Sequence, residues 1–141
     1  MKRKIIILLL VFASGSLYGQ RLERLVVNNQ GLSESKMGDA GIAGKTLEMN
    51  LEEDLGATAY VHAYLSPDSS EDAVHNVTFV CLREYQGKLE WYDERTADIR
   101  SHTTHCSVSF TLIDEGLFQI VMRDAENPGR IYGHSWFKVT R

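Results

Sequence analysis

The sequence predicts an all-β protein, built as a single antiparallel β-sandwich of about eight short strands. Apolar and polar residues alternate with a period of two over several segments, which is the pattern of strands that bury one face. Clusters of Gly, Pro, Asn, Asp and Ser separate these segments roughly every dozen residues. No long segment after the N-terminal region shows the apolar period of an amphipathic helix. These three observations are typical of a sandwich or a barrel.

The N-terminus has the three parts of a secretory signal peptide. Positive charges at 2–4 precede an apolar run at 5–13, and small residues follow it. A first core strand is the alternative interpretation, but it leaves the three charges unexplained. We therefore expect a signal peptide at 1–19, cleaved before Gln20, and one β-sandwich domain at 20–141.

This leader resembles those of proteins that Gram-negative bacteria export, so we expect a periplasmic or secreted protein. Its apolar run is shorter than the roughly 20 residues that span a bilayer, and we expect no transmembrane anchor in the mature chain. Cleavage after Gly15 is an alternative. Loss of the three leader cations changes the formal charge from −4 to −7. Because such a surface repels polyanions, we expect no nucleic-acid partner.

The first half of the mature chain is expected to hold three strands. Apolar residues gather in 21–28, and strict alternation marks 46–52 and 57–65. The glycine-rich stretch 32–45 is expected to form a surface loop. The Ser66-Pro67 sequence is expected to end the third strand, because proline lacks a backbone donor.

The second half is expected to hold five strands that are joined mainly by tight turns. Gln86-Gly87 is expected to form a hairpin turn in which Gly87 adopts a positive φ. The polar stretch 93–101 is expected to be irregular. The five predicted strands are 74–85, 89–92, 103–113, 117–122 and 131–140.

The closing segments GLFQIVMRD and WFKV resemble the last two strands of immunoglobulin-like β-sandwich domains exported by bacteria. The resemblance covers about the last quarter of the chain, and it implies an immunoglobulin-like architecture. The Cys-Trp-Cys pattern of antibody domains is not matched. Trp91 does stand between the two cysteines, but Cys106 follows Cys81 by only 25 positions. The resemblance therefore implies an architecture and no functional residues.

Cys81 and Cys106 are the only cysteines, and each shares a strand face with apolar residues that are expected to point into the core. An oxidising compartment permits one disulfide between them. The alternative is two buried free thiols that pack as small apolar groups. We favour the bridge, which requires Cα atoms about 4.4 to 6.8 Å apart.

The histidines are candidate metal ligands, because neutral imidazole is a common ligand. Residues 102 and 105 would point to opposite faces of a strand, and no cysteine or carboxylate stands at a zinc-site spacing from them. We therefore expect surface imidazoles and no cofactor. A small metal-binding protein or enzyme that uses the histidines is the alternative function. The five are His62, His75, His102, His105 and His134.

Recognised catalytic motifs are missing from the sequence. It contains no GxSxG elbow and no phosphate-binding glycine loop. His105 and Cys106 are neighbours in the chain, so in a strand they face opposite sides and do not readily share a proton. We therefore expect that the protein is not an enzyme.

Two aromatic ladders form the best candidate for a binding site. If their strands are neighbours, the ladders form one exposed platform that would stack on a glycan or dock a protein strand. The alternative is that both ladders pack, in a second core layer or beneath the loop 32–45. The sequence thus predicts a noncatalytic binding or structural module of the bacterial cell envelope, with an unknown protein or glycan partner. The ladders are Tyr60, His62 and Tyr64 on one strand and Tyr132, His134 and Trp136 on another.

Overall fold

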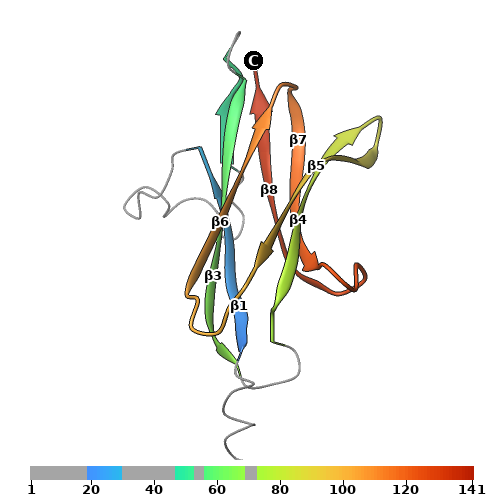
Figure 1. Ribbon diagram of the computed structural model, residues 1–141. Coiled ribbons are helices and arrows are strands. Elements are labelled where there is room, and N and C mark those ends of the chain that lie inside the picture. The colour runs from blue at the N-terminus through green and yellow to red at the C-terminus, as the bar shows by residue number, and fades with distance from the viewer. Residues whose placement is uncertain (1–18, 30–46, 53–55, 69–72) are drawn as a thin grey trace, which may run out of the picture.

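The computed structural model describes residues 19–29, 47–52, 56–68 and 73–141. All the secondary-structure elements in these residues are β-strands (Figure 1). The predicted signal peptide, apart from Gly19, and the predicted loop 32–45 lie outside these residues. No helix that could cross a membrane is found in the described part of the chain. The strands are β1 (Gly19–Asn28), β2 (Leu47–Asn50), β3 (Ala57–Asp68), β4 (Asn76–Tyr85), β5 (Lys88–Asp98), β6 (His105–Leu112), β7 (Gly116–Asp124) and β8 (Ile131–Thr140).

The eight strands form two sheets. One has three strands in the order β1-β3-β6, and the other has five in the order β2-β8-β7-β4-β5. Every pairing is antiparallel except that of β2 with β8. In Figure 1 the three-stranded sheet lies on the left and β4, β7 and β8 lie on the right. The predicted all-β sandwich is confirmed.

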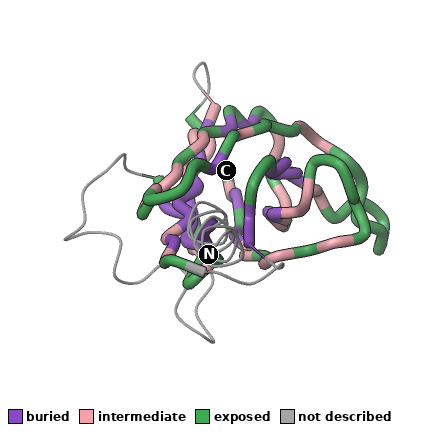
Figure 2. The backbone as a smooth tube through the Cα atoms, turned by 60° about the horizontal axis from the view of Figure 1, so that its bottom comes forward, coloured by how far each residue is buried: buried purple, intermediate pink, exposed green. Residues whose placement is uncertain are grey.

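The core lies between the two sheets and is filled by alternate residues of the strands. Four phenylalanines, one each from β4, β6, β7 and β8, are fully buried there. The rings of Phe118 and Phe137 are stacked with their centroids 5.3 Å apart, and Tyr92 meets Phe118 edge-on at 5.1 Å. Figure 2 shows the buried segments inside the section and the exposed segments along much of its outline. Each strand therefore leaves its other face free for contacts outside the core.

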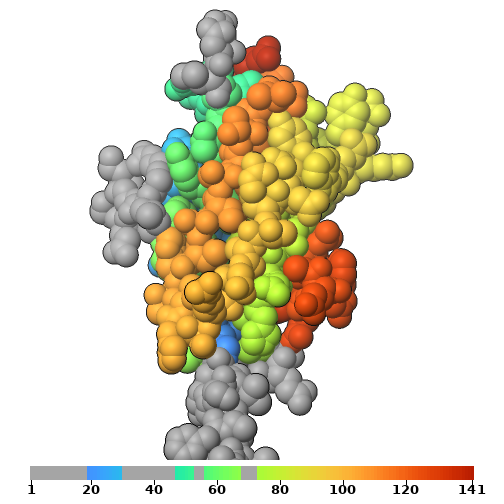
Figure 3. All heavy atoms as spheres, in the orientation of Figure 1, coloured from blue at the N-terminus to red at the C-terminus, as the bar shows by residue number. Residues whose placement is uncertain are grey.

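The predicted β4–β5 hairpin is confirmed at Gln86-Gly87. Gly87 has a φ of 80°, in the left-handed region that glycine enters without steric cost, and Gln86 has a φ of 51°. The hairpin projects from the body of the molecule at the upper right of Figure 3. Its outer end exposes the large apolar side chains of Tyr85 and Leu89.

Two predicted strand ends are wrong. The stretch 93–101 was expected to be irregular, but β5 continues to Asp98. It does so as the edge strand of the five-stranded sheet, where charged side chains face water and limit pairing with other chains. Likewise, β3 continues through Pro67 to Asp68, because pairing with β1 persists there after the register with β6 has ended. Proline is tolerated where one side of a strand has no neighbour.

The predicted disulfide is not formed, and both cysteines are free. Both thiols point toward the core as expected, but Cys81 lies on β4 of one sheet and Cys106 on β6 of the other. Cys81 is fully buried. Side-chain parity places a residue on the correct face of its strand, whereas the position along the opposing sheet depends on how the two sheets are stacked.

Candidate functional site

The two predicted aromatic ladders lie on different sheets. β3 is the central strand of the three-stranded sheet, and β8 lies between β2 and β7 in the five-stranded sheet. The condition for one continuous platform was that the two strands are neighbours, and it is not met. Each ladder is therefore described on its own sheet.

The ladder on β3 faces away from the core, since the intervening residues Ala59, Val61 and Ala63 are fully buried in the core. Even so, the side chain of His62 is only 1% exposed, and that of Val26, its partner on β1, is buried as well. Tyr60 and Tyr64 on either side are half-buried. The middle of this outer face is therefore not open to a ligand.

His62 and His105 form a close pair across β3 and β6. The distance from Nδ1 of His62 to Nε2 of His105 is 3.0 Å, and the two rings are stacked with centroids 5.2 Å apart. One nitrogen of this hydrogen bond donates and the other accepts, so the contact holds a single proton. The second ring nitrogen of His62, Nε2, is buried and has no hydrogen-bond partner among the described residues. Burial, and secondarily the proximity of His105, lower the pKa of His62.

Tyr64 and Arg24 complete this histidine cluster, which we define as Arg24, His62, Tyr64 and His105. The guanidinium carbon of Arg24 lies 4.3 Å from the centroid of the Tyr64 ring, a cation–π contact. The same ring lies 5.1 Å from the ring of His105. The described residues contain no group of three or more His, Cys, Asp or Glu side chains that could hold a metal ion. The cluster is thus satisfied mainly by its own contacts.

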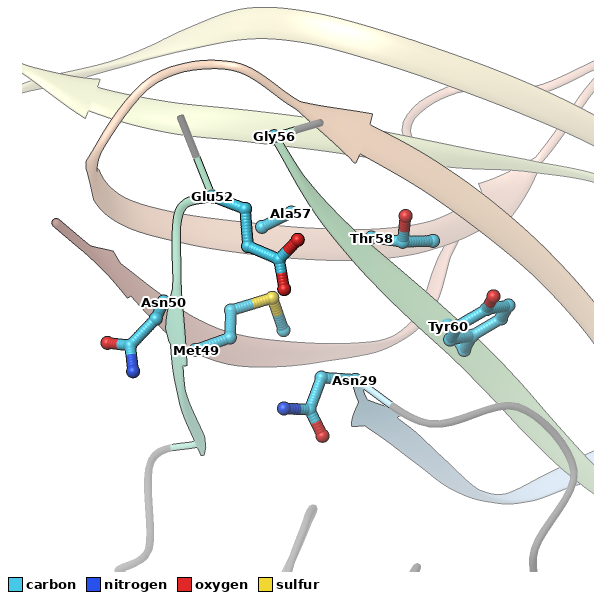
Figure 4. A pocket seen from close by; sticks show the side chains of 8 residues that line it. All are labelled: Asn29, Met49, Asn50, Glu52, Gly56, Ala57, Thr58 and Tyr60. Carbon is cyan, nitrogen blue, oxygen red and sulfur yellow. The ribbon is translucent and has the colours of Figure 1, made fainter. Parts of the chain in front are cut away.

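A polar cavity of about 320 Å³ lies at the other end of β3 (Figure 4). Figure 4 shows Met49 and Glu52 on one side of it and Thr58 and Tyr60 along β3 on the other. Glu52 is the one charged residue among its described lining residues, so the cavity offers hydroxyl, amide and carboxylate groups without a catalytic pair. Its lining is Asn29, Met49, Asn50, Glu52, Gly56, Ala57, Thr58 and Tyr60.

The ladder on β8 is broken by a β-bulge at Tyr132. Gly133 pairs with Met122 and Ile131 with Arg123, so Tyr132 is an extra residue between them. Its ring packs against the core, and its hydroxyl donates to Oδ2 of Asp124 at 2.9 Å. Ile131, which alternation predicted to face inward, is 59% exposed for the same reason. His134 and Trp136 remain on the outer face.

Asp124 organises the turn that precedes β8. Its Oδ1 accepts hydrogen bonds from the backbone N–H groups of Asn127 at 3.0 Å and Glu126 at 2.8 Å. These two bonds, and then the bond from the Tyr132 hydroxyl, lower the pKa of Asp124. Asp124 and Tyr132 therefore have a structural role.

The outer face of the five-stranded sheet brings the two tryptophans of the chain into one row. Trp136 of β8 pairs with Gln119 of β7, Gln119 with Leu82 of β4, and Leu82 with Trp91 of β5. The next row runs from His134 through Val121 and Val80 to Glu94. We call this surface the tryptophan face; its apolar residues are Val80, Leu82, Leu89, Trp91, Leu117, Val121, Ile131 and Trp136.

This face is more apolar than a solvated sheet surface needs to be. Antiparallel sheets that face water usually alternate apolar residues inside with polar residues outside. Here Trp91 is 59% exposed and Leu89 is 43% exposed, while Leu82, Val121 and Trp136 between them are half-buried. A contiguous apolar surface bordered by polar residues is typical of a protein–protein contact.

The charges on the tryptophan face are sorted by strand. Cations and the imidazole stand on β7 and β8, and carboxylates stand on β4 and β5. Glu48 of β2 stands beside Lys138 at the far margin of the sheet. The residues on β7 and β8 are Arg123, His134 and Lys138, and the carboxylates on β4 and β5 are Glu84, Glu94 and Asp98.

Sequence reasoning found Trp136 and His134 but missed their neighbours on this face. Leu82 and Val121 read as core residues, because continuous apolar runs do not show which side chains face outward. Trp91 lies in a predicted strand and keeps the outward phase of Leu89, while Tyr92, the extra residue of a bulge opposite Cys81/Leu82, packs against the core. The alternation of Leu89 and Trp91 is the signal that could have identified this side of the face.

The remaining histidine and cysteine candidates contribute nothing to a shared site. His102 and His75 are exposed, and of the pair 102 and 105 only His105 joins the histidine cluster. Burial raises the pKa of the Cys106 thiol, and burial together with Asp93 raises that of Cys81 to about 12. Such thiols are poor nucleophiles near neutral pH, because the thiolate is the reactive form.

Comparison with known proteins identifies the fold. No family model matches the chain, and no curated protein matches its sequence. A similar solved structure is the crystal structure of an immunoglobulin-like protein from Pseudomonas aeruginosa. It is 12% identical, with a TM-score of 0.52, and the match covers 86% of this chain and 96% of that one. The immunoglobulin-like β-sandwich architecture is therefore confirmed, and the likeness extends to the fold alone.

Proposed function

We propose that this chain is a noncatalytic binding module of the Gram-negative cell envelope, and that it holds a protein partner on the tryptophan face. The row from Trp136 to Trp91, which is apolar apart from Gln119 and ends at the exposed ring of Trp91, is the observation that carries this proposal. Large amphipathic rings supply much of the energy of protein–protein contacts, and both tryptophans of the chain lie in this row.

The surroundings of Trp91 favour a protein partner over a glycan. A sugar that stacks on a ring also needs polar groups beside the ring to orient its hydroxyls. On the outer face, Trp91 stands across from Leu82 and beside Leu89, which are both apolar, and the one charged neighbour in its own strand is Glu94 beyond the bulge. Carboxylates and cations stand at the margins of the face, where they would border a partner protein.

The histidines support the rival function, metal binding or catalysis, less well. His62 and His105 bind each other, and no third ligand joins them among the described residues. His134 stands on another sheet, on the tryptophan face.

Export rests on the sequence pattern of the first 19 residues. The intact mass of the protein, purified from its native host, should correspond to a chain that begins at Gln20. A folded product that retains 1–19 would contradict export by this signal.

Capture from an envelope extract of the native host tests the proposed face. The immobilised protein should retain a protein partner, and Trp91→Ala should reduce the retained amount by about tenfold or more, as the loss of a central aromatic contact does. Ile113→Ala is the matched control, because Ile113 is an apolar residue that is 70% exposed and lies outside this face. Equal retention by the Trp91→Ala variant, or an equal loss in the control, would contradict the proposal.

A further inference from the structure

We propose that the partner on the tryptophan face is a second copy of this chain, packed about a two-fold axis that runs parallel to the strands. This inference rests on the proposed function and names the partner.

The register makes the face self-complementary. The tryptophan face is four strands wide, in the order β8-β7-β4-β5. A two-fold axis midway between β7 and β4 places β8 over β5 of the second copy, and β7 over β4. Trp136 then lies over Trp91 of the second copy, because both belong to one row. Two such ring pairs form, one on each side of the axis.

The charges match in the same arrangement. His134 and Glu94 stand at the two ends of the second row. His134 of each copy therefore lies over Glu94 of the other copy, which gives two such contacts. Beside the axis, Val121 lies over Val80 of the second copy and Gln119 lies over Leu82, so three of these four central residues are apolar, although Val80 is itself buried in its sheet. More generally, the cationic side of one face meets the acidic side of the other, which is the electrostatic pattern of specific interfaces.

The other in-plane axis fits poorly. A two-fold axis perpendicular to the strands would place β8 over β8 and β5 over β5. Carboxylates such as Glu94 would then stand over the acidic side of the second copy, and like charges across an interface are costly. Both axes keep the strands of the two sheets roughly aligned, as in ordinary sheet-on-sheet packing, so the charges decide between them.

The size of the face predicts a reversible dimer. Four strands spaced about 4.8 Å apart and four rows spaced about 6.8 Å apart outline a plane of about 500 Å² on each copy. Stable specific interfaces bury about 800 Å² per partner, so this contact is at the weak end of the range. We therefore expect monomer and dimer to exchange, and the dimer to prevail only at raised concentration.

Sedimentation velocity of the purified protein, from about 1 to 200 µM, tests this inference. The expected result is a dimer whose fraction rises with concentration. Trp91→Ala should raise the dissociation constant by about tenfold or more, whereas Ile113→Ala should leave it unchanged. Both residues are exposed, so neither change should unfold the monomer, and the midpoint of unfolding checks this for each variant.

A charge exchange tests the axis itself. His134→Glu alone should weaken the dimer, because it places two carboxylates over one another. Glu94→Lys alone should also weaken it, because it removes the carboxylate that faces the imidazole of His134. The double variant should regain most of the lost affinity, because opposite charges again meet across the axis. A double variant that is weaker than either single variant would overturn the proposed packing.

The remaining outcomes separate this inference from the proposed function. A protein that stays monomeric up to the highest concentration, but loses an envelope partner with Trp91→Ala, overturns the second-copy inference and leaves the binding face standing. A protein in which Trp91→Ala affects neither self-association nor capture overturns both.

Discussion

His62 is an ionisable residue whose burial disfavours its charged form. Its imidazole is buried on the outer face of the three-stranded sheet, and one ring nitrogen has no described partner. Protonation of His62 would place a cation against His105, in the cluster that also holds the Tyr64 ring and the guanidinium of Arg24. Burial therefore favours the neutral form of His62 in the folded chain and, with the proximity of His105, lowers its pKa.

The stability of the protein should consequently fall in acid. The unfolded chain binds a proton at His62 near the ordinary pKa of 6.5, whereas the folded chain does so only at lower pH. The free energy of unfolding should be highest above pH 6.5 and decline below it, with a slope of at most about 1.4 kcal/mol per pH unit for this one proton.

Denaturant unfolding of His62→Phe between about pH 5 and 8 measures this contribution. The variant should lose part of the acid dependence, while the exposed control His75→Gln should keep it. An unchanged slope in His62→Phe would show that His62 does not carry the effect.

Trp136 differs from a core aromatic residue in what its removal should cost. It is half-buried on the outer face, whereas Phe118 is fully buried between Phe137 and Tyr92. Trp136→Ala should lower the free energy of unfolding by less than about 2 kcal/mol, and Phe118→Ala by about 3 to 5 kcal/mol. Equal losses in denaturant unfolding would place Trp136 in the core and remove it from the binding face.

At the scale of the element, the position of each cysteine in its sheet determines whether it is bridged and how reactive its thiol is. Cys81 and Cys106 belong to opposing sheets and are free, and burial raises the pKa of both thiols. The native protein should therefore react little with a thiol reagent. Unfolding without reductant should release two thiols, and reduction should leave the midpoint of unfolding unchanged. A count of zero thiols would show that the bridge exists.

Alternation along the chain was enough to predict where the strands are. Segments such as 103–113 and 131–140 carry the period-two pattern directly, and β6 and β8 lie there. What alternation could not predict is a change of phase inside a strand. The bulges beside Trp91 and at Tyr132 each insert one residue, and no local composition marks them. One bulge took Tyr132 out of its predicted ladder, and the other shifts the phase of β5 after Trp91, so that Glu94 shares the outer face with Trp91.

At the scale of the whole molecule, strand order decides which residues share a surface. The predicted ladders on β3 and β8 had similar compositions, but pairing in separate sheets keeps them apart. Trp136 instead joins Trp91, which is 45 positions earlier in the chain. The two tryptophans share a row because β7 and β4 lie between β8 and β5 in the sheet. The sequence of a single strand does not contain this strand order. The sequence thus supplied half of the candidate site, and the topology supplied the other half.

The central claim is that the tryptophan face is covered in the native envelope. Hydroxyl-radical footprinting of Trp91 and Trp136, read by mass spectrometry, measures this coverage directly. Oxidation of both should be several-fold lower in intact envelopes of the native host than in the dilute purified protein, relative to exposed Ile113 as the internal reference. Equal oxidation of the two tryptophans in both settings would contradict the claim.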